Sequence, residues 1–382
     1  MRGRTAVAMA ALPVGGLFAA ALLALASGSG GATTRTYYIA ADEVEWDYAP
    51  SGRNLISGLP FDEVERDWVA TGPDRIGRVY LKALYREYMD STFTTLKPRP
   101  PEWEHLGFLG PLLRAQVGDT IRVVFRNNAR FPASVHPHGV FYTKSSEGAP
   151  SADGTSGADR ADDGVPPGGT HVYVWPVPER AGPAHGDPSS VLWMYHSHVN
   201  EEKDVSTGLL GAMIVTARGK ARADASPEDV DREIVVAFAE VDENESWFLD
   251  HNIDTYTTDP ASVPRDQIAF FQPFGDSNFK ESMNGFLYGH LRLPDLRVGD
   301  KVRWYLMADT NFSVHAPHWH GNTVVANHMR TDVVSLTTME MLIADMVPDD
   351  PGAWLFHCHV GGHLKRGMQA RYTVLPEDLA RR

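Results

Sequence analysis

The chain has 382 residues and a formal net charge of −14 at neutral pH. This length suits two domains of ordinary size, and the acidic balance argues against a nucleic acid or an anionic membrane surface as partner. The single cysteine excludes an intrachain disulfide.

The first residues have the pattern of a secretory signal peptide. Arg2 and Arg4 precede an apolar run over residues 5–26, which ends in the small residues Ala24-Leu25-Ala26. We expect residues 1–34 to be a signal peptide with a short linker, so that the protein is exported and secreted. The alternative is a membrane anchor. No other segment approaches the roughly 20 apolar residues that span a bilayer, so we expect no membrane association after cleavage.

The rest of the chain contains an internal repeat. Val117-Gly118-Asp119 opens a strand-like run over residues 120–128, and His136 follows it. Val298-Gly299-Asp300 opens a second run over residues 301–309, and His318 follows that one. Many short apolar runs separated by Gly and Pro turns predict an all-β protein of two β-sandwich domains.

Each repeat also carries two clusters in which histidines alternate with other residues. In an extended strand, alternating side chains lie on one face, so each pair presents two imidazoles together. One such pair would be weak support for a metal site, but four in this order are strong support. The clusters are His136-Pro137-His138-Gly139, His196-Ser197-His198, His315-Ala316-Pro317-His318-Trp319-His320-Gly321 and His357-Cys358-His359.

The last cluster contains the only cysteine and is followed by His363 and Met368. Thiolate, imidazole and thioether are the ligands of a blue copper electron-transfer site. In a strand, Cys358 faces one side while His357 and His359 face the other. The pattern therefore predicts one copper beside Cys358 and a separate metal site beside the two histidines, connected by a short covalent path.

Together with the four clusters, the segments between them resemble the multicopper oxidases, and specifically the ceruloplasmin branch. The runs that carry the resemblance are residues 37–50, 85–95, 154–169, 178–199, 242–253 and 283–289. The resemblance implies two cupredoxin-like Greek-key β-sandwich domains. Domain 1 would span residues 35–218 and lack a type 1 copper, and domain 2 would span residues 219–382 and hold one.

The family's copper ligands carry over to this sequence position by position. Four coppers are implied for each functional unit: one type 1, one type 2 and two type 3. The type 1 positions are His315, Cys358, His363 and Met368. The type 2 positions are His136 and His318, and the type 3 positions are His138, His196, His198, His320, His357 and His359. In the first repeat Ala133, Ser197 and Glu202 stand where the type 1 ligands stand in the second.

The resemblance implies an oxidase that couples one-electron oxidation of a small reducing substrate to four-electron reduction of O2 to water. The cluster that reduces O2 needs protons. Asp153, soon after the first histidine pair, is the predicted catalytic relay, and Glu202 and Asp204 are weaker candidates. An ordinary Asp-Gly turn is the alternative interpretation of Asp153.

Assembly and substrate follow from the same resemblance. Two-domain relatives form rings of three subunits, in which domain 1 of one chain meets domain 2 of the next, so a homotrimer is predicted; a monomer is the alternative. Gly362 replaces an acid that helps to bind iron in the ceruloplasmin branch, which favours laccase-like oxidation of phenols and aromatic amines. Ferroxidase activity through Asp276 and Glu281 is the alternative, followed by copper nitrite reductase and a non-enzymatic copper carrier.

Overall fold

The computed structural model describes residues 32–270, 273–310 and 314–377. The predicted signal peptide lies almost entirely outside this range. Among the described residues, no helix is long and apolar enough to cross a membrane.

The first half of the chain forms two four-stranded sheets. One has the order β2-β1-β4-β6 and the other the order β3-β8-β7-β5. The strands of the first sheet are β1 (Thr34–Asp47), β2 (Val79–Tyr88), β4 (Thr120–Asn127) and β6 (Thr170–Pro176). Those of the second are β3 (Leu113–Gln116), β5 (His136–Pro137), β7 (Ser190–His196) and β8 (Leu210–Thr216).

The second half repeats this plan with a six-stranded and a four-stranded sheet, ordered β10-β9-β12-β16-β14-β15 and β11-β18-β17-β13. The strands of the larger sheet are β9 (Arg232–Asp242), β10 (Phe279–Met283), β12 (Val302–Ala308), β14 (Val324–Ala326), β15 (Met329–Thr331) and β16 (Met341–Met346). Those of the smaller sheet are β11 (Leu296–Arg297), β13 (Pro317–Trp319), β17 (Gly352–Cys358) and β18 (Gln369–Leu375). In both halves the strand that follows Val-Gly-Asp pairs in parallel with the first strand of that half, β4 with β1 and β12 with β9.

Each half buries its own apolar core, and a third core joins the two halves. Phe125 and Trp175 belong to the core of the first half, while Trp304 belongs to that of the second, together with Cys358. Side chains from β7, β8, β9 and β12 form the third core between the halves. We propose the domain boundary between residues 218 and 219, because this position falls between β8 and β9.

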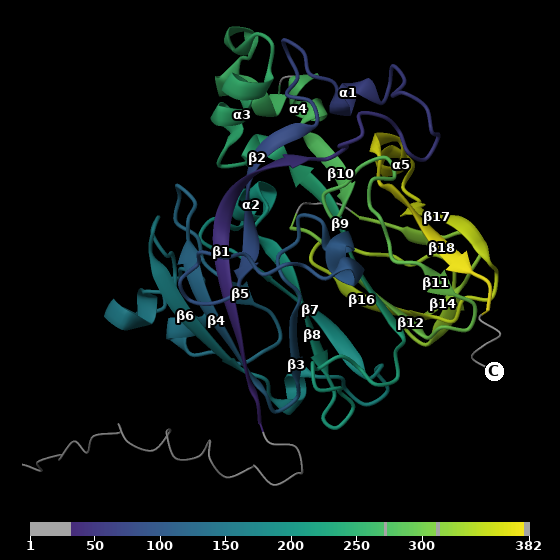
Figure 1. Cartoon of the computed structure of the whole chain (residues 1–382). Coiled ribbons are helices and arrows are strands. Elements are labelled where there is room, and N and C mark those ends of the chain that lie inside the picture. The colour runs from purple at the N-terminus through teal and green to yellow at the C-terminus, as the bar shows by residue number, and fades with distance from the viewer. Residues whose placement is uncertain (1–31, 271–272, 311–313, 378–382) are drawn as a thin grey trace, which may run out of the picture.

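Most helices gather at one end of the molecule. Figure 1 shows α1, α3 and α4 above β2 and β10, where the segment after β1 lies beside the segment after β9. The α-helices are α1 (Arg66–Val69), α2 (Glu201–Thr207), α3 (Leu249–Tyr256), α4 (Phe274–Ser277) and α5 (Gly361–Arg366). The 3-10 helices are η1 (Pro101–Leu106), η2 (Lys144–Ser146), η3 (Gly157–Arg160), η4 (Glu179–Ala181), η5 (Glu243–Glu245), η6 (Pro260–Ser262) and η7 (Arg265–Phe270).

A fully buried ion pair connects the halves beneath these helices. Lys82 on β2 lies 2.5 Å from Glu243 on η5, and neither side chain is exposed to solvent. The Lys82 ammonium also donates to the Ser206 carbonyl, and the Tyr48 hydroxyl donates to the Glu243 carboxylate. Because each charge has lost its water, each depends on its partner.

We expect Lys82→Met to lower the free energy of unfolding by about 3–5 kcal/mol, because it leaves the Glu243 carboxylate buried without its counter-ion. The double variant Lys82→Met/Glu243→Gln should regain part of that loss. Urea denaturation of the metal-free protein measures both. Equal losses in the single and double variants would contradict this explanation.

The exposed pair of Lys97 and Glu87 is the matched control. Its atoms lie 2.9 Å apart, but the Lys97 side chain is 49% exposed. Lys97→Met should therefore change the free energy of unfolding by less than about 1 kcal/mol.

Candidate metal centres

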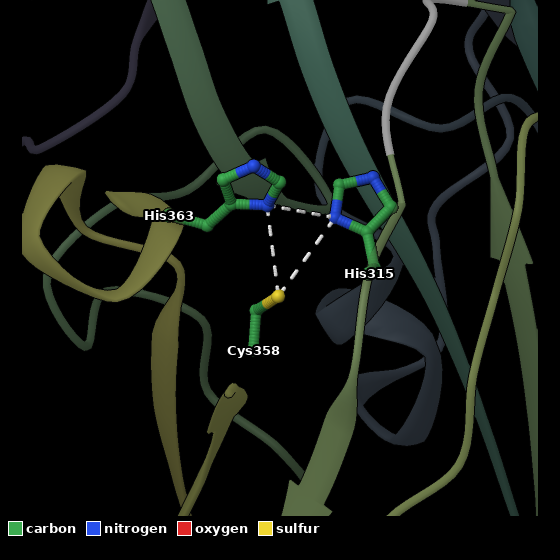
Figure 2. Close-up of side chains that lie close together, drawn as sticks. All are labelled: His315, Cys358 and His363. Atoms are coloured by element: carbon green, nitrogen blue, oxygen red, sulfur yellow. Dashed lines mark hydrogen bonds between the residues drawn. The ribbon is translucent and has the colours of Figure 1, made fainter. Parts of the chain in front are cut away.

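Three side chains from the second half converge around the thiol. Cys358 ends β17, His363 lies on α5, and His315 lies just before β13. The Cys358 Sγ atom is 3.6 Å from His363 Nδ1 and 4.0 Å from His315 Nδ1, and the two nitrogens are 3.2 Å apart (Figure 2). We call these residues the thiolate group. The three donor atoms point toward one another from three separate segments.

This triangle fits a copper ion in size and in chemistry. Its three sides enclose a point roughly 2 Å from every donor, the distance at which imidazole nitrogen and thiolate bind first-row transition metals. One sulfur and two imidazoles are also the in-plane ligands of a blue copper site. Met368 is fully buried in the same core as Cys358, and its carbonyl accepts the Cys358 N–H. Burial raises the pKa of the Cys358 thiol, so a metal is needed to stabilise the thiolate at neutral pH.

Four imidazoles of the first half form a second group, which we call the first histidine group. It consists of His136, His138, His196 and His198. His136 on β5 lies directly opposite His196 at the end of β7. The Nε2 atoms of His138 and His196 are 3.1 Å apart. The His136 ring also contacts His198, with centroids 5.1 Å apart.

The second half repeats this arrangement in a second histidine group, made of His318, His320, His357 and His359. His318 on β13 lies opposite His357 on β17. The Nε2 atoms of His320 and His357 are again 3.1 Å apart. The internal repeat of the sequence is therefore also a repeat of imidazole geometry.

Backbone carbonyls fix the tautomer of four of these rings. The Nδ1 atoms of His136 and His318 lie 2.6 and 2.8 Å from the carbonyls of Glu147 and Asp332. Those of His196 and His357 lie 3.1 and 2.8 Å from the carbonyl of the following residue. A carbonyl only accepts, so Nδ1 carries the proton in each ring. The Nε2 lone pair is then free to bind a metal, which is how metal-bound histidines are usually oriented.

The two histidine groups do not meet within the chain. Among the described residues, the contacts between their rings join histidines of the same half only. His320 and His359 are exposed, and the His198 side chain is 37% exposed. Each group therefore presents part of its imidazole surface outward.

A hydroxyl network occupies the place in the first half that the thiol occupies in the second. The Ser197 hydroxyl donates to Asp204 at 2.6 Å, and the same carboxylate oxygen accepts the N–H groups of Val199 and Asn200. The Trp247 indole N–H from the second half donates to the other oxygen at 2.8 Å. The buried carboxylate of Asp204 thus fixes the position of the segment that carries His196 and His198.

Asp153 lies apart from the histidines. It is exposed, its carboxylate is 2.7 Å from the Lys144 ammonium, and it accepts hydrogen bonds from Thr155. These partners hold its pKa below the usual range, which makes it a poor proton donor. The carboxylate that does reach the first histidine group is Glu201, 3.5 Å from His198 Nε2. Sequence reasoning missed it because nothing in the motif distinguishes Glu201 from its neighbour Glu202.

A pair of carboxylates adjoins the thiolate group. Glu240 on β9 is the direct cross-strand partner of Glu281 on β10, and one oxygen of each lies with a ring nitrogen of His363 within 4.8 Å of one another. We call the two acids the carboxylate pair. Glu281 was a sequence candidate; Glu240 was not, and Asp276 lies on α4 outside this cluster.

The carboxylate pair is electrostatically strained. The Glu281 side chain is 2% exposed, and its Oε2 atom has no hydrogen-bond partner. Burial and the neighbouring Glu240 raise the pKa of Glu281 to about 8. Two like charges this close favour either a proton or a cation between them.

Comparison with known proteins identifies a family for the chain. Family models described as multicopper oxidase match residues 106–220 and 262–378. The chain is 43% identical over 366 residues to Ferroxidase HEPHL1 of Homo sapiens and 39% identical over 360 residues to ceruloplasmin of Rattus norvegicus. These matches cover 95% and 94% of the chain but 31% and 33% of the relatives. The chain thus spans about a third of their length.

A solved structure described as a multicopper oxidase has the same fold. It superposes with a TM-score of 0.56 at 19% sequence identity, covering 90% of this chain and 89% of that one. The prediction of an all-β, cupredoxin-like protein is confirmed.

Acid should destabilise the metal-free protein through His196 and His315. Burial and neighbouring histidines lower the pKa of both to about 3, whereas an unfolded imidazole titrates near 6.5. The unfolded chain therefore binds more protons than the folded one between these values, and stability falls as the pH drops below about 6.5. We expect each histidine to cost roughly 3 kcal/mol by about pH 4.5, measured by urea denaturation at pH 7 and 4.5.

His315→Asn, which cannot take up a proton, should flatten this dependence by the share of His315. An unchanged pH slope in that variant would show that other groups cause the acid sensitivity.

Proposed function

The chain belongs to the multicopper oxidase family, and from that premise we propose that it is a ferroxidase. Four Fe(II) ions would each lose one electron, and one O2 would take up four electrons and four protons to give two waters. Copper is the family's cofactor, and the thiolate group and the two histidine groups have the donors that copper requires.

The observation that carries this proposal is the carboxylate pair beside the thiolate group. Carboxylate oxygens suit Fe(II), a harder cation than Cu(I), and one oxygen each of Glu240 and Glu281 and a ring nitrogen of His363 lie within 4.8 Å of one another. A divalent cation between them would relieve their mutual repulsion. It would also lie close to the ring that accepts the electron, since Glu281 Oε2 is 3.7 Å from His363 Nδ1.

The similar proteins support iron over a phenol. HEPHL1 is named a ferroxidase. This favours ferroxidase activity, the alternative, over the laccase-like activity that the sequence favoured. That preference rested on Gly362. The structure supplies a carboxylate at Glu240, on a different strand, which supports iron binding without an acid at position 362.

The chain itself provides the connection between the sites. Bound copper supplies one-electron redox chemistry. We propose that the thiolate group and Met368 hold the type 1 copper. His136 and His318 would hold the type 2 copper, and the other six histidines of the two histidine groups the type 3 pair. Cys358 faces one side of the strand while His357 and His359 face the other, so a single peptide bond on either side of Cys358 would connect the substrate side with the oxygen side.

We propose that Glu201, rather than Asp153, relays protons to the oxygen-reducing side. Glu201 follows the first histidine group on α2, and its side chain is 38% exposed. It therefore touches both solvent and His198, as a relay between water and the reacting oxygen requires.

We expect Glu240→Gln and Glu281→Gln each to raise the KM for Fe(II) at least about tenfold, because each removes one charge from the cation site. Turnover of a neutral dihydroxybenzene should change little. Steady-state oxygen consumption with each reductant measures both. Equal losses with both reductants would show damage to the copper sites and contradict the proposal.

Asp276→Asn is the matched control, since Asp276 is an acid of the same end of the molecule outside the cluster. Its KM for Fe(II) should stay within about twofold of the parent.

We further propose that the working unit is a homotrimer, in which the first histidine group of one copy faces the second histidine group of the next. Neither group holds the full set of imidazoles alone, and head-to-tail contact that closes into a ring completes every site. Exposed apolar side chains near both groups suit such a contact. Phe141 and Tyr142 follow His138 of the first histidine group in sequence, and Val333 forms a β-bridge with His318 of the second.

Subunit mixing tests this arrangement. One variant, His138→Ala/His198→Ala, lacks a working first group, and another, His320→Ala/His359→Ala, lacks a working second group. Each alone should be inactive. Unfolding, mixing and refolding them together with copper should restore activity at interfaces that join the two intact groups.

A mixture that stays inactive, although each variant is folded and trimeric in sedimentation, would rule out sites shared between subunits. The reference for full and partial activity is the parent refolded together with a chain that carries all four histidine substitutions.

A further inference from the structure

Arg366, the last residue of α5, lies against the carboxylate pair. Its Nη1 atom is 3.5 Å from Glu281 Oε1, and its guanidinium carbon is 5.2 Å from the centre of the Trp68 ring on α1. The Arg366 side chain is 31% exposed and that of Glu281 is 2% exposed. The guanidinium is thus the more solvent-exposed partner of the ion pair and touches an aromatic face as well.

A guanidinium and a divalent cation compete for the negative charge of the same carboxyl group: Arg366 contacts Glu281 Oε1, whereas Oε2 faces His363. Glu281 lies among Glu240 and Asp309, whose charges act on it, and Arg366 offsets part of this negative charge in the free protein. A cation bound by the carboxylate pair would bring at least two positive charges close to a third. A bound cation would therefore weaken the Arg366–Glu281 contact.

Trp68 gives the displaced guanidinium a second favourable position. Arginine stacks on indole rings through cation–π attraction. Arg366 already contacts Trp68, and this contact can stay while the contact with Glu281 is released. Arg366 can therefore release Glu281 and still keep its contact with Trp68 when a cation is bound.

We propose that Arg366 is a built-in competitor that sets the affinity of the carboxylate pair for divalent cations and returns to Glu281 when the product leaves. The inference rests on the proposed ferroxidase function. Oxidation adds one positive charge to the bound iron, so Fe(III) would bind the two carboxylates more tightly than Fe(II) does. A guanidinium that competes for Glu281 counteracts this retention and speeds product release.

The test is calorimetric titration of the copper-loaded protein with Mn(II), together with steady-state kinetics on Fe(II). Arg366→Met should lower the Kd for Mn(II) about tenfold, and should lower both KM and kcat for Fe(II). Arg366→Lys, which keeps the charge, should stay near the parent. Weaker or unchanged Mn(II) binding in Arg366→Met, or the same change in both variants, would overturn the inference.

Arg130→Met is the matched control, because Arg130 also pairs with an acid and covers an aromatic ring. Its Nε donates to Glu43 at 2.9 Å, and its guanidinium carbon lies 5.1 Å from the Phe248 ring centre. This variant should leave Mn(II) affinity unchanged. A change equal to that of Arg366→Met would show a general effect of charge and also overturn the inference.

Glu281→Gln separates this inference from the function beneath it. If Glu281→Gln leaves Mn(II) binding and Fe(II) turnover unchanged, the carboxylate site itself is wrong. If Glu281→Gln abolishes Mn(II) binding but Arg366→Met has no effect, only the role of Arg366 is wrong.

Discussion

The register of two short strand pairings is the constraint on which the metal centres depend. His136 lies opposite His196, and His318 lies opposite His357. Side chains alternate along a strand, so a slip of one residue would turn each histidine pair to the opposite face and exchange Cys358 with its neighbours. Tryptophan packing helps to hold this register. A Cβ at Gly139 or Gly321 would lie 2.3 Å from the ring of Trp193 or Trp354, so only glycine leaves room for the indole after each histidine pair.

The two halves share this frame but use it differently. In the second half a buried thiol accepts the Ala316 N–H and faces two imidazoles. In the first half Ser197 donates to Asp204, whose other oxygen accepts the Trp247 indole N–H of the second half. The position that holds the thiol in the second half is therefore a polar anchor for the histidine segment in the first half. The first histidine group is accordingly held in place by residues of both halves.

Sequence patterns were sufficient for the parts of the site that are local. The alternation around Cys358 and the four histidine clusters predicted which imidazoles share a face, and the all-β fold followed from the repeat. Contacts that depend on which strands pair could not be predicted from the sequence. In the sequence Glu240 is an ordinary polar residue near the end of an apolar run, and only the pairing of β9 with β10 brings it opposite Glu281. Asp153 stays a prediction of the sequence, and its partners in the structure, Lys144 and Thr155, are contacts that the spacing of the histidine pair does not predict.

The carboxylate pair is the feature on which the proposed substrate depends. Two facing acids, one of them buried, weaken the fold unless a positive charge lies between them. Arg366 meets this need only in part, because its single charge faces several acids and it is shared with Trp68. In the proposed ferroxidase a divalent cation, unlike a neutral phenol, can take the place of the proton between the two acids, so the pair would favour a cation as substrate. Because Glu281 Oε2 also lies 3.7 Å from His363 Nδ1, a cation held by the pair would lie beside the ring that we propose accepts its electron.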